Sequence, residues 1–192
     1  MKKSLKIIIT IIAILVIIFA VFAVMFVLDI SAYTATGSQT LTPEGTSTGT
    51  ALVLYDPGYS GAATRVAEQV AIDLQTKGYK VTLAGIKSGD AKNTDGYDII
   101  VIGGPIYAGV PTVSVKDALN NLNPDTGVMV GVYGSGSGTT SPEDIKQIIK
   151  GVPALGSDGA LSNAIVVKIG EKEDLNARAE DFVNQLTTQS AT

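Results

Sequence analysis

The sequence predicts an α/β protein: a three-layer, doubly wound domain with a five-stranded parallel sheet, preceded by a single transmembrane helix. From residue 51 onward, short apolar runs alternate with amphipathic stretches, which is the pattern of strands and helices taking turns along a chain. Two of the runs, Ile99–Ile102 and Ile165–Val167, are apolar without interruption. Such runs are typical of strands that helices cover on both faces, as in a parallel sheet.

Five runs have the composition of strands, and we expect them at Ala51–Tyr55, Lys80–Leu83, Asp98–Gly103, Val128–Tyr133 and Ala164–Ile169. Apolar residues at helical spacing predict helices along Val66–Leu74, Ile145–Val152 and Leu175–Leu186. Ser141-Pro142-Glu143 predicts a helix start, because a hydroxyl caps free amides and Pro fits the first turn. Lys77-Gly78 predicts a helix end. The polar stretch Gly85–Tyr97 predicts at most a short helix.

Residues 1–29 predict a cytoplasmic tip and a membrane anchor. Residues 7–28 carry no charge, and these 22 positions exceed the roughly 20 that a helix needs to cross a bilayer core. Lys2, Lys3 and Lys6 precede the run and the next basic residue is Arg65, which predicts a cytoplasmic N-terminus and an extracytoplasmic C-terminal domain. A cleaved signal peptide is the alternative, although its apolar core usually has only about 7–15 residues.

Residues 30–50 predict a disordered linker, with the folded domain at 51–192. From Ser31 to Thr50, ten of the twenty residues are Ser or Thr and three are Gly. A stretch of this composition has little apolar surface to bury, so burial does not offset the entropy lost on ordering.

Composition excludes several kinds of chemistry. The chain has no Cys and no His, which excludes disulfides, thiolate catalysis, imidazole-bound metals and Ser-His-Asp hydrolysis. No catalytic residue and no metal site is predicted. The first 28 residues hold three of the 14 basic side chains and no acidic one, so the remainder has 11 basic and 18 acidic residues and a net charge of −7. This charge argues against nucleic acid as a partner.

Three Gly-rich loops follow the first, third and fourth predicted strands: residues 56–64, 103–111 and 133–140. In an open parallel sheet, ligands bind beyond the carboxyl ends of the strands, where the strand order reverses. The first loop leads into a helix, whose free amides and positive dipole end favour an anion. The second carries Tyr107, on which a planar ligand can stack. Each glycine run also has a purely structural interpretation as a turn or connector.

The order of these elements, with Gly-Gly-Pro-Ile-Tyr-Ala-Gly after the third strand, resembles the flavodoxin family over nearly all of residues 51–188. The resemblance implies strand order 2-1-3-4-5 and bound FMN, with its phosphate on the first loop and its ring between the other two. The implied FMN contacts are Gly58, Tyr59, Ser60, Gly61, Ala62, Ala63 and Thr64; Pro105, Ile106, Tyr107, Ala108 and Gly109; and Tyr133, Gly134, Ser135 and Gly136.

The first loop departs from the phosphate loop of that family, which resembles Thr/Ser-x-Thr-Gly-x-Thr. In the register of the following helix, the three hydroxyl positions fall on Gly58, Ser60 and Ala63, so only Ser60 is retained. Gly61 matches the family glycine, and Thr64 lies one position beyond the last hydroxyl. Each lost hydroxyl removes a hydrogen bond to a charged group, worth about 1.5–3 kcal/mol.

Three functions are compatible with these residues. An electron carrier that binds FMN at the membrane exterior is the leading hypothesis, because no side chain resembles an acid–base catalyst. An FMN-dependent quinone reductase is the enzymatic alternative, and a binding module that has lost flavin is the third. The membrane, through residues 7–28, and an unidentified redox protein are the expected partners.

Overall fold

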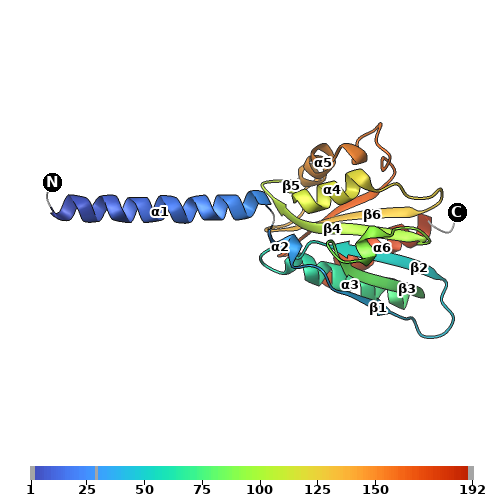
Figure 1. Cartoon of the computed structure of the whole chain (residues 1–192). Helices are drawn as coiled ribbons and strands as arrows, with labels where there is room; N and C mark the ends of the chain where they lie inside the picture. The colour runs from blue at the N-terminus through green and yellow to red at the C-terminus, as the bar shows by residue number, and fades with distance from the viewer. Residues whose placement is uncertain (1–2, 29, 190–192) are drawn as a thin grey trace. The chain divides into compact units, whose positions relative to one another are not determined.

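The computed structural model describes residues 3–28 and 30–189, and the chain divides into two compact units, Met1–Ile30 and Ser31–Thr192. Helix α1 (Lys3–Leu28) makes up most of the first unit (Figure 1). Within the described residues it is the one helix that is long and apolar enough to cross a membrane, over Leu5–Met25, a test that an N-terminal signal sequence also passes. The short helix α2 (Ile30–Tyr33) follows it.

The second unit is built on the predicted parallel sheet. Its five central strands are β2 (Gly49–Tyr55), β3 (Tyr79–Gly85), β4 (Ile99–Tyr107), β6 (Met129–Gly136) and β7 (Ile165–Gly170). They pair in parallel in the order β3-β2-β4-β6-β7. Counted along the chain, this is the order 2-1-3-4-5, so the prediction of fold class and strand order is confirmed.

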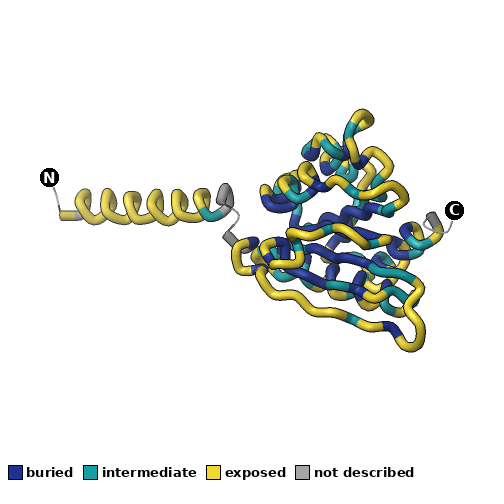
Figure 2. The backbone as a smooth tube through the Cα atoms, turned by 45° about the vertical axis from the view of Figure 1, so that its right-hand side comes forward, coloured by how far each residue is buried: buried dark blue, intermediate teal, exposed yellow. Residues whose placement is uncertain are grey.

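Helices cover both faces of the sheet, which explains the uninterrupted apolar strands. One core packs α3 (Ala62–Thr76) and α6 (Leu175–Gln189) on one face, and the other packs α4 (Val113–Asn121) and α5 (Pro142–Gly151) on the opposite face. The inner positions of these five strands are accordingly buried, most completely in β4 and β6 (Figure 2). Ser141 caps α5 in a capping box with Asp144, and α3 ends just before Gly78, as the sequence predicts.

The prediction of a disordered linker at 30–50 is wrong for most of that stretch. Strand β1 (Ser38–Leu41) adds an antiparallel edge to the sheet by pairing with β3. Before β1, Ala32 is fully buried. The backbone of Ala35 lies so close to Gly85 that a Cβ atom on Gly85 would overlap the Ala35 backbone. The free edge of β3 explains this order, because main-chain pairing gives hydrogen bonds to a polar strand whose one apolar side chain, Leu41, packs against the core.

The remaining elements are short. Strand β5 (Val110–Pro111) folds back on the end of β4 through a two-residue turn at Ala108 (φ +50°) and Gly109 (φ +83°). Between β3 and β4 the chain forms only the 3₁₀ turn η1 (Asp90–Lys92), in agreement with the expected absence of a long helix there. A second such turn, η2 (Pro153–Leu155), follows α5.

Candidate functional site at the carboxyl edge

The first two predicted loops meet at the carboxyl edge of the sheet, where β2 and β4 end side by side. Gly58 has a φ of +60°, and a Cβ on it would come within 2.8 Å of the Pro105 ring, so the backbone of the first loop packs closely against that side chain. The Tyr59 amide donates a hydrogen bond to the Tyr107 hydroxyl at 3.4 Å. Their rings lie 6.2 Å apart between centroids and are tilted by 39°. The edge therefore presents two neighbouring aromatic rings.

A buried carboxylate joins these loops. Asp56 follows β2 directly and is fully buried. Its Oδ2 accepts hydrogen bonds from Thr112 Oγ1 at 2.8 Å and from Ser114 Oγ at 2.6 Å, and its Oδ1 accepts one from the Gly58 amide at 3.0 Å. Because Thr112 caps α4 and Ser114 lies in its first turn, Asp56 ties the first loop to the start of that helix.

The N-terminus of α3 presents backbone donors to this edge. Gly61 caps the helix with a φ of +68° and supplies no side chain to bind its amides. Nothing in the described chain accepts a hydrogen bond from the amides of Ala63 and Thr64. Unpaired first-turn amides and the helix dipole favour an anion at this position.

Two charged side chains flank this N-terminus, and sequence reasoning found neither of them as part of the site. Glu171, from the loop between β7 and α6, accepts a hydrogen bond from Ser60 Oγ at 3.3 Å. The guanidinium of Arg65 lies 3.9 Å from the position that a Cβ on Gly61 would occupy. Arg65 could have been recognised from the sequence, because it is the first basic residue after Lys6 and falls in the first turn of α3. Glu171 could not have been recognised in this way, because 111 residues separate it from Ser60.

The third loop is held by a charged network beneath it. Lys168 Nζ is nearly buried, and it donates to Asp144 Oδ2 at 3.1 Å and to the Thr139 carbonyl at 3.3 Å. Hydrogen bonds from Ser141, followed by the one from Lys168, hold the pKa of Asp144 below its ordinary value. Thr140 Oγ1 donates to Glu173 Oε2 at 2.6 Å. The loop is thus fixed by side chains of β7, α5 and the start of α6.

Several of the predicted contact residues lie inside the domain. Tyr133 is 1% exposed, its hydroxyl donates to the Ala63 carbonyl at 3.0 Å, and its ring fills the space that a Cβ on Gly103 would need. The side chain of Ile106 covers Gly134 in the same way. Ala62, Ala63, Pro105 and Ser135 are also buried. Of these residues, Ala62 and Ser135 also line a small cavity at the start of α3, and Pro105 and Ser135 lie within β4 and β6, which continue as strands through Tyr107 and Gly136.

The structure brings the other predicted residues to the surface of one edge. They are at least partly exposed: Gly58, Tyr59, Ser60, Gly61, Thr64, Ile106, Tyr107, Ala108, Gly109 and Gly136. Gly109 is in turn covered by the side chain of Gln147 from α5. A cavity of about 60 Å³ lies between the start of α3 and the loop after β7, lined by Arg65, Ser135 and Glu171 among others.

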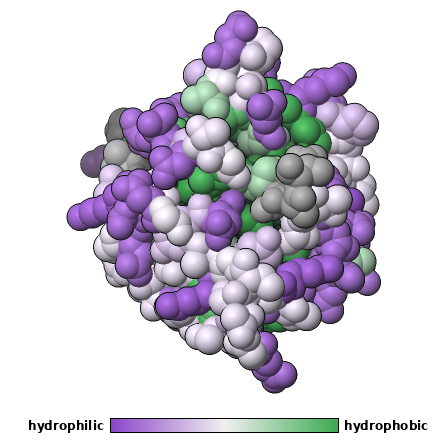
Figure 3. Space-filling view, turned by 90° about the vertical axis from the view of Figure 1, so that its right-hand side faces the viewer, coloured by the Kyte–Doolittle hydropathy of each residue, from purple (hydrophilic) through white to green (hydrophobic). Residues whose placement is uncertain are grey.

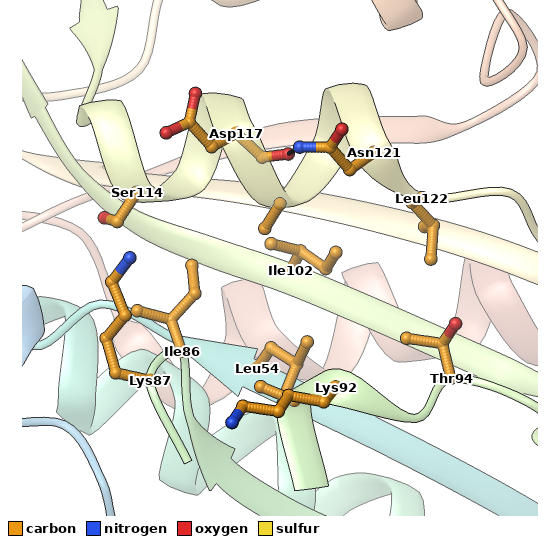
Figure 4. A pocket seen from close by; sticks show the side chains of 12 residues that line it. Leu54, Ile86, Lys87, Lys92, Thr94, Ile102, Ser114, Asp117, Asn121 and Leu122 are labelled. Atoms are coloured by element: carbon orange, nitrogen blue, oxygen red, sulfur yellow. Dashed lines mark hydrogen bonds between the residues drawn. The ribbon is translucent and has the colours of Figure 1, made fainter. Parts of the chain in front are cut away.

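Two larger cavities lie elsewhere. One, of about 310 Å³, opens between η1 and α4 over Leu54 and Ile102; Lys87 and Ser114 line it (Figure 4). The other, of about 520 Å³, lies at the start of β6 and β7, at the opposite end of the sheet from the loops. Figure 3 shows a face of the domain on which hydrophilic (purple) and intermediate (white) residues alternate, with hydrophobic (green) patches between them.

No protein-family model and no curated protein matches the chain. Solved structures do match. A short-chain flavodoxin associated with a non-canonical PDU bacterial microcompartment aligns over 73% of this chain and 98% of its own, with 24% identity and a TM-score of 0.54. The fold is that of the flavodoxins. A flavodoxin from Streptococcus pneumoniae TIGR4 (22% identity) and flavodoxin 2 from Bacillus cereus (18%) each align over 73% of this chain, with TM-scores of 0.52. The first covers 98% and the second 99% of its own length.

The residues at the carboxyl edge fit the two ends of FMN. Unpaired amides of α3, with Arg65 beside them, suit a phosphate, and the rings of Tyr59 and Tyr107 suit a flat aromatic group. At Gly61 the loop backbone is uncovered except by Arg65, whereas Gly58 packs against Pro105 and Tyr107. The fold brings the α3 amides and the two tyrosine rings to one edge of the sheet.

Proposed function

We propose that this chain is a membrane-anchored, FMN-binding electron-transfer domain. The observation that carries the proposal is the meeting of unpaired amides at the α3 N-terminus with the Tyr59–Tyr107 pair, at the carboxyl edge of a flavodoxin fold. FMN, when bound, supplies the electron chemistry; the chain binds, orients and shields it. The amides of Ala63 and Thr64, Ser60 and Arg65 would hold the phosphate, and the two tyrosines would flank the ring.

An electron carrier is favoured over a substrate-transforming enzyme. The chain has no His and no Cys, and Asp56, the carboxylate that joins the two aromatic loops to α4, is buried and accepts three hydrogen bonds. The Asp56 carboxylate holds the loops together through these bonds and is buried, so it is poorly placed to exchange a proton with a substrate. A soluble or membrane-bound redox protein is therefore the expected partner.

Flavin binding is tested on the full chain in detergent. The purified protein is mixed with FMN at micromolar concentration and passed through gel filtration. We expect the visible absorbance of FMN to elute together with the protein. Tyr107→Leu should weaken binding about tenfold, since stacking on one aromatic is worth about 1–3 kcal/mol. The matched control is Tyr97→Leu, which removes a tyrosine remote from the loops. Wild-type protein that leaves the column colourless would overturn the proposal.

The anchor is tested in cells. We infer that residues 7–28 stay in the membrane, with the N-terminus in the cytoplasm and the domain outside. Because Ala32 is already part of the folded domain, only a few residues would connect the span to it. Intact protein should remain with membranes after carbonate washing, and protease added to spheroplasts should remove the domain. A soluble, shortened product whose measured mass corresponds to a chain that begins after residue 28 would show cleavage instead.

A further inference from the structure

The retained hydroxyl of the phosphate loop is already committed within the chain. A serine hydroxyl has one proton to donate. Ser60 gives that proton to Glu171 Oε1 at 3.3 Å, while its oxygen accepts the Ala62 amide at 3.3 Å. A phosphate oxygen that binds Ser60 must therefore take the place of the Glu171 carboxylate.

The backbone of Glu171 is fixed to the sheet, so its exposed side chain can leave Ser60 only by rotating away. Its backbone amide donates to the Gly136 carbonyl at 2.9 Å, which fixes the start of the loop to the end of β6. Its side chain contacts Ser60 directly and also lines the small cavity at the start of α3. A carboxylate so close to a bound phosphate repels it, by about 1 kcal/mol at 4 Å even in bulk water.

Arg65 acts in the opposite direction. It lines the same cavity, its guanidinium lies against Gly61, and it forms no ion pair with any described residue. Its charge is therefore available to an incoming anion, because neither Glu171 nor another described carboxylate lies within ion-pair distance.

We propose that Glu171 is a built-in competitor for the phosphate position and that Arg65 opposes it, so that this pair sets how strongly the site prefers FMN over riboflavin. The inference rests on the proposed flavin site and deepens it, since it names the residues that determine the charge of the ligand. The two flavins share the ring and differ in the phosphate ester, so their affinity ratio isolates the phosphate position from the rest of the site.

The experiment measures dissociation constants of FMN and riboflavin by flavin fluorescence quenching, using the full chain in detergent. Glu171→Ala should tighten FMN about tenfold, since it frees one hydrogen bond to a charged group and removes a like charge. Arg65→Ala should weaken FMN about fivefold. Neither change should move the riboflavin constant by more than about twofold. The control is Glu68→Ala, which removes the same charge from an exposed site further along α3 and should leave both constants unchanged.

A second titration uses inorganic phosphate alone, followed by the amide NMR shifts of Ser60, Gly61 and Thr64. Phosphate should bind Glu171→Ala more tightly than wild type. If flavins bind but Glu171→Ala changes neither the FMN-to-riboflavin ratio nor the phosphate affinity, the inference is overturned while the proposed function stands. If no flavin binds but the phosphate difference appears, the flavin function fails and the competition by Glu171 is supported.

Discussion

Removal of the Asp56 carboxylate should be the most damaging single change at the candidate site. Asp56→Ala deletes the acceptor of three hydrogen bonds, two of them from the hydroxyls of Thr112 and Ser114, which are each 6% exposed and lie 3.2 Å from one another. Each buried donor that loses its acceptor costs about 1–3 kcal/mol, and a bond between the two hydroxyls together with the relief of an otherwise buried charge offsets part of the sum. We expect a net loss of about 3 kcal/mol in the free energy of unfolding, which lowers Tm by about 6–12 °C for a domain of this size.

The measurement is thermal unfolding of the full chain in detergent, followed by circular dichroism. The matched control is Asp98→Ala, because Asp98 Oδ2 accepts bonds of similar length from the Thr50 amide (2.7 Å) and hydroxyl (3.0 Å) but is exposed. Water replaces the lost acceptor there, so the cost should stay near or below about 1 kcal/mol. Equal Tm shifts for the two variants would refute the reasoning that burial decides the cost.

Three further changes test other contacts. Tyr133→Phe removes a buried hydroxyl that donates to the Ala63 carbonyl and should cost about 1 kcal/mol by denaturant titration; no change would mean that this bond adds nothing. Ala108→Asn should raise stability by about 1 kcal/mol in the same titration, because φ is +50° and Asn tolerates this conformation better than Ala, whereas Ala108→Val should lower it. Burial acts to raise the pKa of Glu173, but hydrogen bonds from Thr140 and Gly170, with Arg178 nearby, outweigh it and hold that pKa below its ordinary value. The stability this carboxylate adds is therefore complete above its unfolded pKa of about 4.3 and is lost as pH falls through the folded value, so Glu173→Gln should flatten the decline of Tm below about pH 4.3; an unchanged acid limb would contradict it.

The architecture could be predicted because its signals are local. Continuous apolar runs such as Ile99–Ile102, the spacing of Val66, Val70 and Leu74, and the cap at Ser141 each report on neighbouring residues only. Strand β1 could not be predicted in this way. Its four residues gain order from the unpaired edge of β3, and that edge is about 40 residues further along the chain.

The glycines of the site show a different limit of sequence reasoning. A glycine after a strand indicates that something approaches the backbone closely, but it does not say what approaches. At Gly103 and Gly134 the space is taken by Tyr133 and Ile106, side chains of the adjoining strands. At Gly58 and Gly61 the φ values of +60° and +68° shape the loop itself. One sequence signal thus serves core packing in one place and an open loop in another, and only the paired register of β4 and β6 separates them.

The contact between Ser60 and Glu171, which the sequence did not reveal, changes the interpretation of the first loop, residues 56–64. Loss of the hydroxyls at positions 58 and 63 alone would indicate a weaker version of the same anion site. In the competition proposed above, Glu171 occupies the remaining hydroxyl and supplies the negative group that a phosphate would otherwise supply. The positive charge of Arg65, whose guanidinium lies beside Gly61, offsets the negative charge of Glu171 at the start of α3. The balance of these two side chains, rather than the number of hydroxyls, should therefore decide which flavin the loop accepts.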